Sequence, residues 1–199
     1  IIDYKTGTKD FMLSDIIYGL NMQMLIYLLA IQKNGKQKYG DIIPAGVLYF
    51  TALKPMVDAE NEKDSFQATD QVKKKLRMNG IILDNISVVS GMEKDGKGIF
   101  IPAEIKNGEI KKSQSLANLT ELSTIARHIE NLIKEMASCL QEGNVSAKPI
   151  CKKNNTACKW CSYFPVCCYE EEKFIEIPTK ITNKKALETM LEEGDSNCE

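Results

Sequence analysis

A carboxylate and an amine lie two residues apart near the start of the chain, at Asp3 and Lys5. If this segment is a β-strand, its two-residue period places both side chains on one face. A carboxylate in that position can hold a divalent cation that polarises a phosphate and activates water, and the lysine can stabilise the charge of the transition state. The pair indicates phosphodiester hydrolysis, with a solvated strand face as the alternative interpretation.

A glutamine and a tyrosine follow one helical turn apart, at Gln23 and Tyr27. The glutamine interrupts an apolar helical pattern, and a buried amide without a hydrogen-bond partner costs on the order of 1–3 kcal/mol. A DNA phosphate, a base edge or Lys5 would satisfy the amide. A partner in the protein core would also satisfy it, with Tyr27 as a packing residue, and periodicity does not separate these alternatives.

Three cysteines share a ten-residue window as Cys158-x2-Cys161-x5-Cys167. A C-x2-C loop can present two sulfurs to one metal, and the third thiolate can supply a further ligand of a four-ligand site. A composition without the cysteine density of a secreted scaffold favours metal over disulfides, and the spacing is compatible with zinc and with iron–sulfur. We expect Trp160 to shield the site, with stacking on DNA as the alternative.

Other residues that can carry chemistry receive structural interpretations. We expect His128 on a helix surface or in a groove, and Cys139 as a small buried hydrophobic residue. The basic sets 73–77 and 148–159 are expected to be solvated faces, with contact to a DNA backbone as the alternative.

The composition is that of an ordinary globular protein. The chain has 199 residues, 26 Lys and Arg against 27 Asp and Glu, and 43% hydrophobic residues. These values exclude a disordered chain, collagen and a coiled coil, and the near-zero net charge says little about partners. No apolar run is long enough for a membrane helix, so we expect no membrane association.

Helices and strands must position these side chains. We expect the strand at 1–5 to carry Asp3 and Lys5, and a helix capped by Ser14 and covered on most faces to carry Gln23 and Tyr27 until it stops at 32–35. The remaining expected elements are a buried strand at 44–53, a helix at 66–77, β structure at 80–89, a hairpin-like stretch at 92–110, a helix at 115–141 and a terminal helix within 183–199.

Three ordered motifs together resemble one family. They are IIDYKTG at 1–7, YGLNMQMLIYLLAI at 18–31 and NTACKWCSYFPVC at 155–167. In this combination they resemble the RecB-like nucleases, and within them the C-terminal nuclease domains of the AddB type. The resemblance implies an α/β, restriction-endonuclease-like PD-(D/E)xK core, a mixed sheet flanked by helices and truncated at its N-terminal side. Its parts would be the C-terminal part of the core (1–143), a cluster-binding segment (144–175), and a terminal helix with a polar tail (176–199).

The resemblance also implies roles for individual residues. Asp3 matches a carboxylate that binds Mg²⁺, Lys5 matches the catalytic lysine, and the carbonyl of Tyr4 is a further metal ligand. Gln23 and Tyr27 match a Q-x3-Y motif beside the active site. The implied cluster ligands are Cys158, Cys161 and Cys167, three of the four that hold a [4Fe–4S] cluster, with the fourth cysteine outside this sequence.

The implied function is Mg²⁺-dependent DNA exonuclease activity in a bacterial, cytoplasmic helicase–nuclease that processes double-strand ends for recombinational repair. Its partners would be single-stranded DNA from unwound duplex ends and, as the other half of a heterodimer, the A subunit of the helicase–nuclease. ATP binding would belong to an upstream part. We expect the present chain to be inactive by itself.

Two alternatives stay open. One is a non-catalytic DNA-binding or scaffold module whose thiols hold a structural metal. The other is a stand-alone Cas4-like nuclease, which the long insert at 30–113 disfavours.

Overall fold

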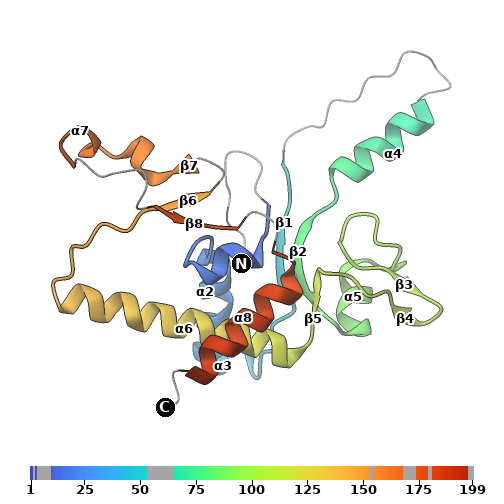
Figure 1. Ribbon diagram of the computed structural model, residues 1–199. Coiled ribbons are helices and arrows are strands. Elements are labelled where there is room, and N and C mark those ends of the chain that lie inside the picture. The colour runs from blue at the N-terminus through green and yellow to red at the C-terminus, as the bar shows by residue number, and fades with distance from the viewer. Residues whose placement is uncertain are drawn as a thin grey trace. The chain divides into compact units, whose positions relative to one another are not determined.

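A computed structural model describes residues 1, 3, 10–52, 65–152, 155–167, 174–178 and 181–196 (Figure 1). The chain forms two compact units. The first contains Ile1–Met12 and Asn21–Ala126, and the second contains Leu13–Leu20 and Arg127–Glu199. The three parts predicted from the sequence are functional segments rather than compact units, and this division stays a prediction.

The first unit contains a mixed three-stranded sheet in the order β1-β2-β5. Strand β1 (Gly46–Tyr49) pairs antiparallel with β2 (Asn79–Leu83), and β5 (Leu116–Ala117) pairs parallel with β2. Gly80 has φ 154°, and a Cβ there would lie 2.0 Å from the carbonyl oxygen of Val47. The close approach of β1 to β2 therefore requires glycine. Together with the helices, the mixed sheet gives the α/β class expected from the sequence.

Apolar side chains pack around β2. The buried cluster consists of Ile82, Val89, Ile101 and Ala103, with Leu48, Val88, Ile105, Ile110 and Leu116 packed against it. Val89 belongs to helix α5 (Ile86–Met92), so the β structure expected over 80–89 is wrong after Leu83. The side chain of Asn85 accepts hydrogen bonds from the backbone N–H groups of Ser87 and Val88, which caps a helix at that point.

A hairpin in the first unit confirms the prediction for 92–110. Strands β3 (Ile105–Lys106) and β4 (Glu109–Ile110) pair antiparallel across Asn107 and Gly108, which have φ 54° and 81°. Two successive residues with positive φ match the twist of a tight hairpin.

The loop before this hairpin is held by Glu93. Its carboxylate accepts hydrogen bonds from the backbone N–H groups of Ile99 at 2.9 Å and Phe100 at 3.1 Å. Burial raises the pKa of Glu93, but backbone hydrogen bonds from residues 98–101 lower it, and the net direction is downward from its ordinary value.

The single helix expected between Ser14 and Asn34 is wrong. The structure has two helices, α1 (Leu13–Ile17) and α2 (Gln23–Asn34). Gly19 and Asn21 between them have φ 74° and 58°, which ends one helix and begins another. Ser14 lies inside α1 and is buried, so it is not an N-cap. Helix α2 is also less covered than expected, because its one buried residue is Leu25.

The other helices follow the predicted pattern more closely. Helix α3 (Lys36–Tyr39) follows α2, and α4 (Ser65–Lys75) confirms the helix expected at 66–77. Helix α6 (Leu119–Gln141) begins later than expected because Leu116 and Ala117 form β5. Its start is a capping box, in which Asn118 and Glu121 each accept the other's backbone N–H. Gly143, with φ 70°, follows its end.

The second unit contains a sheet in the order β7-β6-β8. Strand β6 (Ile150–Lys152) pairs antiparallel with β7 (Asn155–Thr156) and parallel with β8 (Ile175–Glu176). A short 3₁₀ helix, η2 (Ala157–Trp160), follows β7, and helix α7 (Phe164–Cys167) comes next (Figure 1). The cysteine-rich segment is therefore an ordered turn structure built on a small sheet.

Helix α8 (Asn183–Ser196) confirms the terminal helix and packs against α1. Leu13 and Ile16 of α1 and Ala186 and Met190 of α8 are almost fully buried. Each large apolar side chain removed from water contributes about 1.5–3 kcal/mol, so this contact is a main stabilising feature of the second unit. None of the described helices is long and apolar enough to span a bilayer.

Candidate functional site

The segment predicted to carry the catalytic pair is described only in part. Asp3 is partly buried and lies outside any assigned strand, whereas Tyr4 and Lys5 lie outside the described residues. The carboxylate of Asp3 is the type of oxygen ligand that Mg²⁺ prefers. Within the described ranges, no group of three His, Cys, Asp or Glu side chains lies close enough to hold a metal ion. The roles of Asp3, Tyr4 and Lys5 therefore stay predictions.

The glutamine and tyrosine of α2 contact each other. The Nε2 of Gln23 donates a hydrogen bond to the Tyr27 hydroxyl oxygen at 2.8 Å, one turn along the helix. Gln23 is exposed and Tyr27 is 40% exposed, so the interpretation as a buried core amide is wrong. Because the Tyr27 oxygen accepts this bond, its own proton can point to another acceptor. The pair presents an oriented phenol O–H at the surface of the first unit.

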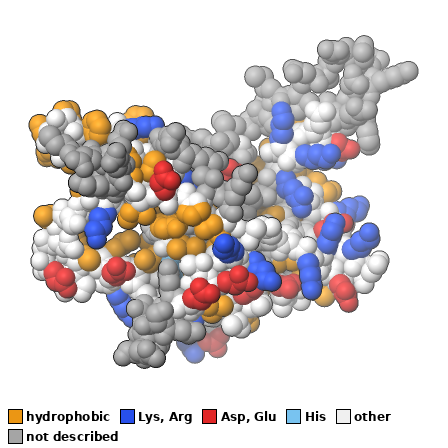
Figure 2. Space-filling view, viewed as in Figure 1, with side chains coloured by type: hydrophobic (Ala, Val, Ile, Leu, Met, Phe, Trp, Pro, Cys, Tyr) orange, Lys and Arg blue, Asp and Glu red, His pale blue; other side chains and the backbone are white. Residues whose placement is uncertain are grey.

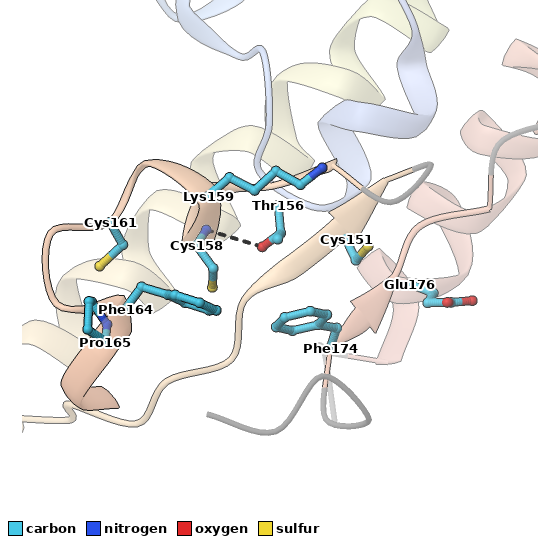
Figure 3. Close-up of a pocket in the computed structure, with 9 residues that line it drawn as sticks. All are labelled: Cys151, Thr156, Cys158, Lys159, Cys161, Phe164, Pro165, Phe174 and Glu176. Carbon is cyan, nitrogen blue, oxygen red and sulfur yellow. Dashed lines mark hydrogen bonds between the residues drawn. The ribbon is translucent and has the colours of Figure 1, made fainter. Parts of the chain in front are cut away.

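Two of the three predicted cluster cysteines line one cavity of about 520 Å³ in the second unit. Cys158 lies in η2 and Cys161 directly follows it, and side chains three residues apart lie above one another in a 3₁₀ helix. The Thr156 hydroxyl accepts the backbone N–H of Cys158 at 3.3 Å and caps the turn (Figure 3). This geometry turns both cysteines toward the same hollow.

The lining of this cavity is mixed. Aromatic and proline carbons of Phe164, Pro165 and Phe174 form one part of it, and Cys151, Lys159 and Glu176 add polar atoms (Figure 3). Cys161, Phe164 and Pro165 are exposed, so the hollow is open to solvent and its apolar carbons border the thiols without enclosing them.

The thiols satisfy part of what a cluster requires. The described cysteines, including Cys158, Cys161 and Cys167, are free rather than disulfide-bonded. Free thiols are the donor type that zinc and iron–sulfur sites use. Cys167 is exposed and does not line the cavity, whereas Cys151 does, so the cavity is bordered by Cys151 and two of the three predicted ligands. The complete set of three stays a prediction.

Several expectations around these residues are wrong. Trp160 is 86% exposed and does not shield the cavity, because its position in η2 differs from that of the cysteine face. Cys139 is only partly buried, and His128 is buried in α6, which excludes the helix surface as one of its two expected placements. Among the apolar residues of α6, Leu119, Ile133 and Met136 are exposed.

A buried ion pair in the second unit was not expected from the sequence. The ammonium of Lys152 on β6 contacts the Asp15 carboxylate on α1, and the Asp15 side chain is 4% exposed. The two residues are 137 positions apart, so no local pattern predicts the contact. The only available signal was a charged residue within the apolar run 13–17. The pair fastens the strand that leads into the cysteine segment to α1.

The structure combines a mixed sheet and helices with a Q-x3-Y pair and a C-x2-C turn. A comparison with protein families identifies the class of protein to which this combination belongs. The model of the PD-(D/E)XK nuclease superfamily matches residues 1–168. The chain belongs to this superfamily.

Similar proteins share one description, the B subunit of an ATP-dependent helicase/deoxyribonuclease. The protein so described from Thermoanaerobacter sp. (strain X514) is 38% identical over 173 residues, 85% of this chain and 15% of the relative. Those from Alkaliphilus oremlandii and Clostridium novyi are 32% and 33% identical, over 98% and 100% of this chain and 18% of each relative. The chain thus spans less than a fifth of the length of these relatives.

Proposed function

We propose that this chain is the Mg²⁺-dependent DNA exonuclease domain of a helicase–nuclease that processes double-strand ends for recombinational repair in the bacterial cytoplasm. The observation that carries the proposal is the superfamily match over residues 1–168, which includes the Asp3 segment and the Gln23–Tyr27 pair. The names of the relatives support deoxyribonuclease chemistry coupled to a helicase.

In this proposal Asp3 and the Tyr4 carbonyl hold the metal, which supplies a Lewis acid and an activated water when it is bound. Lys5 stabilises the negative charge that develops on the phosphate. The Tyr27 hydroxyl, held by Gln23 at 2.8 Å, donates its proton to a DNA phosphate oxygen and positions the strand.

The proposal assigns Cys158, Cys161 and Cys167 to a [4Fe–4S] cluster whose fourth ligand comes from outside this chain. The shared cavity of the first two cysteines and their free thiols support the assignment. Iron and sulfide analysis after anaerobic purification tests the cluster assignment. Stoichiometric zinc without sulfide would show that the cysteines form a structural zinc site instead.

The partners are single-stranded DNA released from unwound duplex ends and the A subunit of the helicase–nuclease. The description of the relatives as B subunits supports a heteromeric assembly. Co-purification of the two proteins tests this part of the proposal separately.

The nuclease proposal is tested in the full-length gene product that carries this chain. We expect Asp3→Ala and Lys5→Ala to slow degradation of linear duplex DNA with Mg²⁺ by about 10²–10³-fold, the loss typical of removing one stabilising group of a transition state. Asp10→Ala is the matched control, because Asp10 is an exposed carboxylate in the same segment. If both variants match this control, the chain is a non-catalytic DNA-binding or scaffold module.

A further inference from the structure

Two aromatic side chains stand out from the cysteine-rich segment. Trp160 is 86% exposed and Tyr163 is 75% exposed, and Val166 nearby is 76% exposed. Figure 2 shows hydrophobic side chains gathered at the surface over the region that Figure 1 labels α7. Folded proteins usually cover at least one face of a tryptophan, so this exposure marks a binding surface.

The local backbone holds these rings outward. Cys158 of η2 and Cys161 directly after it line the cavity, whereas Trp160 between them does not. The turn that follows is fixed by backbone hydrogen bonds from Phe164 N–H to the Cys161 carbonyl at 3.1 Å and from Cys167 N–H to the Tyr163 carbonyl at 2.9 Å. The aromatic pair therefore stands on an ordered turn and binding costs it little backbone entropy.

The charge of the segment favours an anionic partner. No aspartate or glutamate occurs in residues 143–169, whereas four lysines do. Lys152 contacts Asp15. Lys148 and Lys159 are exposed, and Lys159 is the neighbour of Trp160 in η2. Glutamates follow at 170–172, and Glu176 lines the same cavity as Lys159, so the positive charge is confined to the stretch that carries Trp160. Aromatic faces beside lysines are typical of surfaces that bind single-stranded nucleic acid.

We propose that Trp160 and Tyr163 form a platform on which bases of single-stranded DNA stack, with Lys159 on the adjacent phosphates. The inference rests on the proposed function and deepens it, because it assigns a strand-binding surface separate from the hydrolytic residues. A single strand is the favoured ligand, since duplex bases expose only their edges and cannot lie flat on an aromatic ring. A protein partner would require an apolar surface with a neutral or mixed-charge rim, which the lysines oppose.

The sequence provides a direct reporter, because Trp160 is the only tryptophan. We expect a short oligothymidylate, added without Mg²⁺, to quench the indole fluorescence of the chain with saturation, and added salt to weaken the binding. The annealed duplex of the same length should quench far less. Anisotropy of a dye-labelled oligothymidylate measures the variants that lack the indole.

In that assay we expect Trp160→Ala to weaken binding about tenfold and Trp160→Phe to retain most of it, because stacking needs a flat ring rather than an indole. Tyr39→Ala is the matched control. Tyr39 is 59% exposed and lies 5.3 Å from the Lys38 ammonium, so it is an aromatic–lysine surface of the other unit. Thermal unfolding of each variant confirms that folding is unchanged, as expected at an exposed position.

Binding by Trp160→Ala as tight as that of the parent, or equal quenching by single strand and duplex, would overturn the proposal. The proposal would also be overturned if the Trp160 indole did not respond to DNA and were buried in the full-length gene product, because it would then contact protein. Asp3→Ala and Lys5→Ala are measured by degradation of DNA, and Trp160→Ala by binding of oligothymidylate without Mg²⁺. Failure of the nuclease proposal would therefore appear in the degradation assay alone, and failure of the stacking proposal in the binding assay alone.

Discussion

The ion pair between Asp15 and Lys152 offers a sharp test of how the second unit is held together. Removing one partner of a buried pair leaves the other charge without compensation and typically costs about 3–5 kcal/mol. The Asp15 side chain is 4% exposed, but that of Lys152 is 24% exposed and recovers some contact with water. We therefore expect Asp15→Asn to lower the free energy of unfolding by about 3 kcal/mol, the lower end of that range.

Urea unfolding followed by circular dichroism measures this loss. The matched control is Asp41→Asn, which removes a carboxylate from the Lys36–Asp41 pair at 2.9 Å, where the side chains are 76% and 86% exposed. Such a surface pair contributes about 0–1 kcal/mol, so the control should change little. The double variant of Asp15→Asn with Lys152→Met should recover part of the loss, because it removes both charges. Equal losses for Asp15→Asn and Asp41→Asn would refute the argument.

Three further predictions concern stability and use the same unfolding assay. Gly80→Ala should cost about 2 kcal/mol or more, because its Cβ would meet the Val47 carbonyl at 2.0 Å, whereas Gly91→Ala, with no atom within 4 Å, should not destabilise. Met190→Ala should lower the free energy of unfolding by about 2–5 kcal/mol, because Met190 is 1% exposed. Leu191 is 43% exposed, and a larger loss for Leu191→Ala than for Met190→Ala would contradict the packing. The folded-state pKa of Glu93 is lowered, so its contribution is present above the unfolded-state pKa and disappears as the pH falls through the folded-state pKa. Glu93→Gln should flatten stability across that acidic window, and an unchanged pH profile would contradict the hydrogen-bond assignment.

The sequence predicted elements well where one local pattern dominates. The helices expected at 115–141 and within 183–199 are confirmed as α6 and α8, and the strand expected at 44–53 is confirmed as the shorter β1. The expectation that this strand is buried is wrong, since Val47 is its one buried residue. Prediction from the sequence failed where the backbone conformation of single residues overrides the hydrophobic pattern. Positive φ at Gly19 and Asn21 breaks a continuous apolar period, and such a backbone conformation leaves no trace in hydrophobicity.

The β-branched residues after Leu83 show the same limit. Ile86, Val88 and Val89 favour a strand by propensity, but the Asn85 side chain caps the helix that they form. A cap outweighs propensity in so short a segment because it satisfies N–H groups that no intrahelical bond reaches.

The candidate site was predictable only where its contacts are local. The four-residue spacing places Gln23 and Tyr27 on one helix face, although their hydrogen bond was not among the partners expected for the amide. The C-x2-C spacing predicts two cysteines at one site, and both line one cavity. The side on which Trp160 would lie depends on η2 being a 3₁₀ helix, which the sequence does not specify. Contacts that join distant segments, such as Asp15 with Lys152, require the tertiary structure.

The assignment of α1 to the second unit constrains how the chain acquires its structure. Residues 18–182 separate α1 from α8, its packing partner. During synthesis the apolar face of α1 therefore lacks its packing partner until α8 has been made, and this non-local step is the one most exposed to aggregation. Since the chain passes between the units at residues 12–13, 20–21 and 126–127, no single cut yields either unit intact. We expect a chain truncated before α8 to leave the apolar face of α1 without its packing partner.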